Sequence, residues 1–145
     1  MSERKASIRT PHSHIAVAFG APAFVLGTIA SFFVNWVQEQ MLGVIATVAT
    51  LLVALPFWRV VMKSKAGPKR GGFAGAIIGT VSHPVMWFLI LAYESVCGRY
   101  QFENWSEPLA YSFYASAFSL VYTAGSSILV GAVIGHFLNT RAQKA

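Results

Sequence analysis

The sequence predicts an all-α fold, a polytopic membrane protein whose four transmembrane helices form a compact up-down-up-down bundle. Of the 145 residues, 55% are hydrophobic and only 11% are charged, which is too apolar for a soluble domain of this length. The apolar residues fall into four segments, each long enough to cross a hydrocarbon core of about 30 Å. The net charge of +6 is confined to the chain ends and one internal loop.

The distribution of charge predicts how the bundle is oriented. Every lysine and arginine except Arg99 belongs to the N-terminal tail, to Arg59 and the loop that follows it at 63–70, or to the C-terminal tail. Because cytoplasmic loops carry an excess of Lys and Arg, we expect both termini and this loop in the cytoplasm of a bacterium, with the chain in its inner membrane. The opposite side collects most of the acids, namely Glu39, Glu94, Glu103 and Glu107.

The first two segments, residues 15–36 and 41–62, predict an antiparallel helical hairpin. The link between them, at 37–40, is too short for any other connection. Each segment carries small residues three or four positions apart, a spacing that lets a neighbouring membrane helix approach closely. These residues are Ala16, Gly20, Ala23, Gly27 and Ala30 in the first segment, and Gly43, Thr47, Thr50 and Ala54 in the second.

The third segment, residues 72–97, combines a glycine flank with two ionisable side chains. Gly71, Gly75 and Gly79 recur at every fourth residue and remove side chains from one flank of the helix. His83 is expected near the middle of the membrane and Glu94 near its outer surface. At about 100° and 1.5 Å per residue, the two share a helix face about 16 Å apart along the axis.

The fourth segment, residues 109–138, is longer than a perpendicular crossing requires, so we expect it to tilt or to keep its first turn in the interface. Hydroxyl side chains line one side of it, and Ser127, Gly131 and Gly135 extend this line toward the cytoplasm as a second set of helix-packing residues. Such hydroxyls commonly hold membrane helices together. No second domain is visible, so residues 1–145 are treated as one transmembrane domain.

His83 is the strongest candidate for a functional residue, and two roles for it stay open. An ionisable residue inside a membrane is costly and usually faces a partner or a cavity. A neutral imidazole needs only one hydrogen bond, and a hydroxyl of the fourth segment would supply it, so a structural role is preferred. In the alternative, His83 and Glu94 handle protons, with water bridging the gap between them.

Other chemistry is disfavoured by the residues present. The chain has no aspartate and no nucleophile, zinc-protease or phosphate-binding motif, so we expect no enzyme. A dyad of His83 with Ser126 or Ser127 would lack room for substrate and water. A haem between His14 and His136 is the one cofactor that the histidine positions allow, but histidines are common at helix ends, and we expect no cofactor and no metal. No basic stripe supports nucleic-acid binding.

These observations predict a small, non-enzymatic membrane protein that acts as a subunit or assembly partner of a membrane complex, or as a homo-oligomer. Its expected surroundings are the lipid bilayer and either other copies of itself or another membrane protein. The prediction rests on the excess of packing residues over functional polar groups. The alternative is a small proton-coupled transporter or exporter of a small solute, in which His83 carries the proton.

Overall fold

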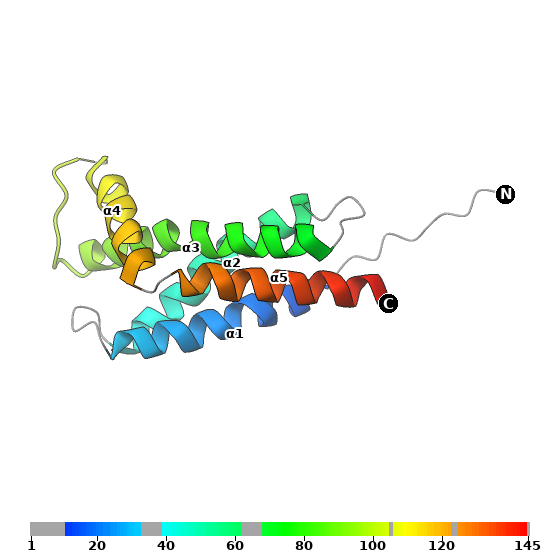
Figure 1. Cartoon of the computed structure of the whole chain (residues 1–145). Helices are drawn as coiled ribbons and strands as arrows, with labels where there is room; N and C mark the ends of the chain where they lie inside the picture. Colours follow the sequence, from blue (N-terminus) through cyan, green and yellow to red (C-terminus); the bar gives the residue numbers. More distant parts are fainter. Residues whose placement is uncertain (1–10, 33–38, 62–67, 105, 123–124, 145) are drawn as a thin grey trace.

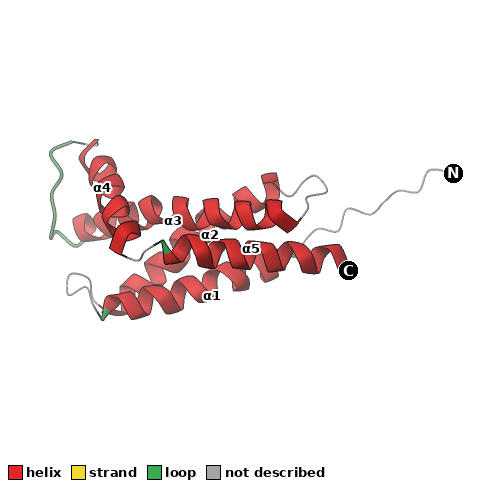
Figure 2. Cartoon of the chain, viewed as in Figure 1, coloured by secondary structure: helices red, strands yellow, loops and turns green. Residues whose placement is uncertain are grey.

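The computed structural model describes residues 11–32, 39–61, 68–104, 106–122 and 125–144, and this part of the chain is helical apart from short turns (Figure 2). The all-α class is therefore confirmed. The N-terminal tail, the end of the first predicted segment at 33–36 and most of the basic loop lie outside the described residues. The helices are α1 (His12–Ser31), α2 (Glu39–Val61), α3 (Pro68–Val96), α4 (Ser106–Tyr122) and α5 (Ser126–Lys144).

Helices α1, α2, α3 and α5 run along a common direction, whereas α4 lies across them at the end where α3 finishes (Figure 1). Helix α1 packs against α2, α2 against α3 and α3 against α5, and a smaller contact between α1 and α5 completes the arrangement. By length and composition, α1, α2 and α3 are apolar enough to cross a membrane, and α4 with α5 would add a fourth, broken span.

The fourth predicted segment differs from the structure, because it forms two helices instead of one. Helices α4 and α5 meet at an angle of 82°. Gly125 adopts a positive φ of 68°, which interrupts a right-handed helix, and its N–H donates to the Leu120 carbonyl at 2.9 Å. The Gly125 carbonyl in turn accepts from the N–H of Ile128 at 2.9 Å. Gly125 thus bonds to residues of both helices, and the expected continuous helix is corrected to a broken one.

Helices α3 and α4 are separated by local signals that the chain itself supplies. At the end of α3, Gly98 has a φ of 69°, and the N–H of Arg99 donates to the Glu94 carbonyl at 3.0 Å, which completes a Schellman cap. At the start of α4, the Asn104 side chain accepts from the backbone N–H of Ser106 at 3.0 Å and of Glu107 at 3.2 Å. Both helix ends are therefore capped by hydrogen bonds within the chain.

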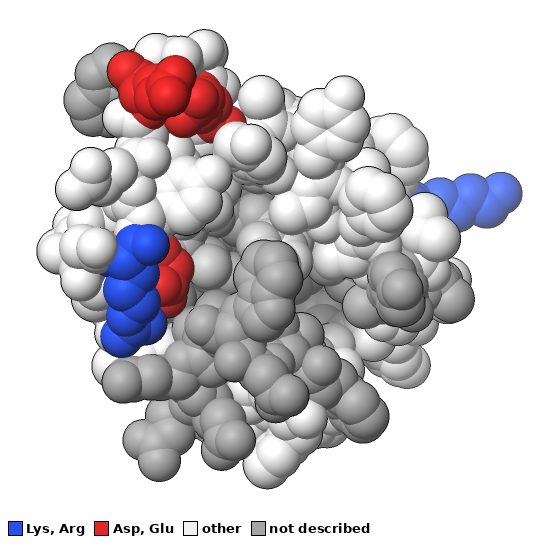
Figure 3. All heavy atoms as spheres, turned by 90° about the vertical axis from the view of Figure 1, so that its left-hand side faces the viewer, with Lys and Arg blue, Asp and Glu red and all other residues white. Residues whose placement is uncertain are grey.

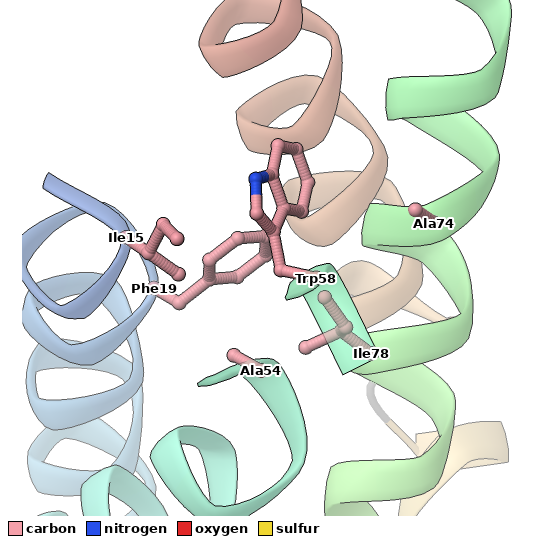
Figure 4. Close-up of a cluster of buried hydrophobic side chains, with 6 residues drawn as sticks. All are labelled: Ile15, Phe19, Ala54, Trp58, Ala74 and Ile78. Carbon is pink, nitrogen blue, oxygen red and sulfur yellow. The ribbon is translucent and has the colours of Figure 1, made fainter. Parts of the chain in front are cut away.

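Small residues allow α1 and α2 to approach closely, as their spacing predicts. A Cβ added at Gly27 would lie 2.9 Å from both the Gly43 Cα and the Ala46 Cβ. Nearer the other end of the bundle, a buried cluster joins α1, α2 and α3 (Figure 4); its members are Ile15, Phe19, Ala54, Trp58, Ala74 and Ile78. The Trp58 ring packs edge-on against Phe19 at a centroid distance of 5.8 Å. A second cluster, centred on Leu42 and Ile90, fills the half near α4.

Most of the apolar surface is not covered by the chain itself. In the most apolar stretches of α1, α2 and α3, only 22%, 33% and 28% of the residues are buried. A soluble protein of this size would leave far less apolar surface in contact with water. Lipid or another protein must therefore cover these faces.

Candidate polar centre around His83

His83 lies halfway along α3, and its imidazole reaches serines in two other helices. Nδ1 is 3.0 Å from Ser119 Oγ in α4, and Nε2 is 2.7 Å from Ser127 Oγ in α5. The hydroxyl partner expected on the fourth segment is therefore present twice, once on each side of the break. His83 is partly buried between these helices.

A tryptophan one turn along α3 extends this centre. The Trp87 indole N–H donates to Ser119 Oγ at 3.2 Å, and the Ser119 hydroxyl donates to the Ser116 carbonyl at 3.0 Å. The hydroxyls of Ser116 and Ser112, one and two turns earlier, bond to carbonyls of their own helix. Among these three serines of α4, Ser119 is therefore the one that receives hydrogen bonds from α3.

The predicted packing residues face one another across the α3–α5 interface. A side chain on Gly75 would overlap the Gly131 carbonyl oxygen, so the two backbones are in direct contact. The reverse also holds, since a side chain on Gly131 would overlap the Gly75 carbonyl oxygen. The structure brings together all six residues of the two predicted sets, as Gly71 with Gly135, Gly75 with Gly131 and Gly79 with Ser127.

Glu94 belongs to a different environment from His83. Its carboxylate pairs with the Arg99 guanidinium at 3.1 Å, and the Arg99 side chain is 44% exposed. His83 and Glu94 were expected on one face of α3, but they do not form one site. His83 bonds to serines of α4 and α5, whereas Glu94 bonds to Arg99 in the loop after α3.

The two histidines considered for haem lie on helices that meet over a small area. His14 in α1 and His136 in α5 are both exposed, and the His136 ring packs against Phe137 at 6.0 Å. In α1 it is His12 that has a defined partner, since Arg59 donates to its Nε2 at 2.8 Å. The described residues contain no group of three or more His, Cys or Glu that could hold a metal ion.

The end of the molecule around the α3–α4 loop carries aromatic and acidic side chains. The Tyr100 ring lies 4.9 Å from Phe102 and 6.5 Å from Tyr111. A side-chain hydrogen bond with Tyr111 raises the pKa of Tyr100 above its ordinary value of 10. Figure 3 looks onto this end and shows its acidic side chains. Tyrosines such as Tyr100 and Tyr111 are typical of a protein segment at the membrane–water interface.

The geometry around Ser127 also bears on the dyad considered from the sequence. A serine hydroxyl 2.7 Å from an imidazole nitrogen has the spacing of a nucleophile and its base. In hydrolases, however, the second imidazole nitrogen is oriented by a group that stabilises the charged ring, usually a carboxylate. Here that nitrogen meets the Ser119 hydroxyl. The arrangement supports hydrogen bonding between helices better than nucleophilic attack.

Sequence reasoning missed two contributors to this centre, Trp87 and Gly125. Trp87 is four residues after His83, so it lies on the same helix face, and that spacing was the available signal. Gly125 stands directly before Ser126 and Ser127, a combination that commonly ends one helix and starts another. The high hydrophobicity of the surrounding residues concealed it.

The chain was compared with protein-family models, with curated proteins and with solved structures, and none of them matched.

Proposed function

We propose that this chain is a non-enzymatic subunit or assembly partner of a complex in a bacterial inner membrane, either with copies of itself or with another membrane protein. In this proposal α1, α2 and α3 cross the bilayer, the broken pair α4–α5 makes the fourth crossing, and both termini are cytoplasmic. Helix α4 lies in the outer half of the membrane, roughly parallel to its plane, because it is bent by 82° from α5.

The observation that carries the proposal is the way in which the interior polar groups are used. Both nitrogens of His83 bond to serines of the same chain, and Glu94 is paired with Arg99. These groups stabilise the fold and leave little polar chemistry for a substrate. The apolar outer faces, by contrast, are mostly uncovered by the chain itself.

The outer face of α2 gives the proposed partner a place to bind. Val53, Pro56, Phe57 and Val60 line an open apolar hollow of about 350 Å³. Their spacing of three and four residues places them on one side of the helix. A partner that inserts a bulky apolar side chain of a transmembrane helix would fill this hollow, because membrane helices associate mainly through close packing.

The test is purification from native membranes in mild detergent, with the mass of the particle measured. We expect a particle that exceeds the 15.7 kDa of one chain and contains a partner in fixed ratio or further copies. Val60→Trp should fill the hollow and reduce the bound partner, whereas Val133→Trp on α5 is the control. Both valines are exposed, at 66% and 54%. Equal loss of partner in both variants would rule out the hollow as the binding place.

A second function, a proton-coupled transporter of a small solute, is favoured by one feature. The fourth segment breaks beside a histidine midway along α3, and broken helices form the binding sites of many transporters. In vesicles containing purified protein, this function predicts a pH-driven flux that His83→Ala abolishes while the fold is retained. Such a flux would replace the subunit proposal, and its absence would leave the transporter without support.

A further inference from the structure

The two halves of the broken fourth segment are anchored to α3 in different ways. Helix α5 is fixed by backbone contacts, since Gly131 and Gly135 meet Gly75 and Gly71 directly. Helix α4 packs against α3 mainly through a face of small hydroxyl residues, and Ser112 and Ser116 on that face bond back to their own helix. The contacts of Ser119 with His83 and Trp87 are therefore directional links between α4 and α3.

Counting hydrogens around Ser119 assigns the proton on His83. A hydroxyl has one hydrogen to donate and two lone pairs to accept with. The Ser119 hydrogen goes to the Ser116 carbonyl, and one lone pair receives the Trp87 N–H. With the Ser119 hydrogen on that carbonyl, the second lone pair is left for His83 at 3.0 Å, and Nδ1 then carries a hydrogen and donates it.

The other ring nitrogen then has a matching role. With its hydrogen on Nδ1, neutral His83 presents a lone pair at Nε2, and the Ser127 hydroxyl donates to it at 2.7 Å. In the opposite tautomer, Ser119 would have to donate to Nδ1 and give up its bond to the Ser116 carbonyl. The first tautomer satisfies every one of these groups, whereas the second leaves a carbonyl without its hydroxyl donor.

We infer that neutral His83, protonated on Nδ1, is a positioning residue that ties the end of α4 to the start of α5 and so fixes the angle of the break. This inference does not depend on the proposed function. The imidazole donates to one helix and accepts from the other, so its loss releases α4, while α5 stays in place through its glycine contacts. Loss of the His83 side chain should therefore change the position of α4 relative to α5 but not the position of α5 relative to α3.

The tautomer is tested by nitrogen NMR of the wild-type protein with labelled histidine in lipid bilayers. The His83 signal is identified by its disappearance in His83→Gln. We expect the signature of a neutral ring with its hydrogen on Nδ1. A hydrogen on Nε2 alone would overturn the inference. Because the tautomer is read from the unaltered protein, this measurement does not depend on the folding of Ser119→Ala.

The positioning role is tested by distances between spin labels, in a Cys97→Ala background. One pair joins α4 to α5 through Phe113 and Val133, which are 65% and 54% exposed. A reference pair joins α3 to α5 through Phe73 and Val133. Ser119→Ala and His83→Gln should add longer distances to the first pair, toward the approximately 30 Å of a straight helix over this span, and leave the reference pair unchanged.

The matched control is Ser112→Ala, which removes a buried hydroxyl from the same face of α4 without removing a bond to α3. We expect it to leave both distances as they are in the unsubstituted background. The inference is overturned if Ser112→Ala and Ser119→Ala have the same effect. It is also overturned if neither Ser119→Ala nor His83→Gln changes the α4–α5 distance in folded protein.

Discussion

At the scale of single residues, two neighbouring glycines of α3 differ in what surrounds them. Gly75 lies against the backbone of α5, where an added methyl group would overlap the Gly131 carbonyl. Gly72 has room, since a Cβ there would lie 3.5 Å from the nearest atom, the Ala132 carbonyl oxygen. Gly75 belongs to the pattern of Gly71, Gly75 and Gly79 and is required for close approach, whereas Gly72 lies outside that pattern and is not.

We therefore expect Gly75→Ala to destabilise the protein and Gly72→Ala to be tolerated. Overpacking of a tight interface typically costs about 1–3 kcal/mol, whereas alanine within a helix is favoured over glycine by about 1 kcal/mol. Thermal unfolding in detergent, followed by loss of the monodisperse peak, measures the difference. Similar unfolding temperatures for the two variants would show that the α3–α5 contact is looser than described.

The residue-scale site was predictable in part. The spacing of Gly71, Gly75 and Gly79 indicates a flank for close approach, and the apolar surroundings of His83 indicate a need for a hydroxyl partner. Which serine would supply it was not predictable, because a hydroxyl can bond to its own helix or to a neighbour at similar cost. That choice depends on the relative positions of three helices.

At the scale of helices, Gly125 allows the chain to break between α4 and α5, and the hydrogen bonds of His83 then hold the angle. The Gly125 φ of 68° is a conformation that other residues adopt only at a cost of about 1–2 kcal/mol. The length and mean hydropathy of segment 109–138 predict a single helix. Mean hydropathy is averaged over many residues, so one glycine changes it very little. The direction of a helix, however, is decided by single residues.

Gly125→Ala should therefore weaken the break and favour a straighter α4–α5. The same spin-label pair at Phe113 and Val133 would report longer distances. Gly98→Ala is the control, since Gly98 also has a positive φ, of 69°, but lies between α3 and the loop. If the distance between the labels at positions 113 and 133 is unchanged by Gly125→Ala but altered by Gly98→Ala, then Gly125 does not determine the break.

At the scale of the whole molecule, the arrangement follows from solvation by lipid. Within a bilayer every backbone polar group must be satisfied internally, so helices are the structure that the apolar segments must form. Composition therefore predicted the class, and the small-residue spacing indicated which flanks would approach closely. Composition did not predict that α4 lies across the other helices. An apolar helix can be covered by lipid whether it crosses the membrane or lies along it, so its composition is the same in both cases.

The most direct test of this account is the side of the membrane on which each end of the bundle lies. The exposed Cys97 follows α3, and Arg141, also exposed, lies in the last turns of α5. A membrane-impermeant maleimide should label Cys97 in intact spheroplasts. Arg141→Cys, in a Cys97→Ala background, should be labelled only after the membrane is opened. Labelling of position 141 from outside, or of Cys97 only from inside, would contradict the account.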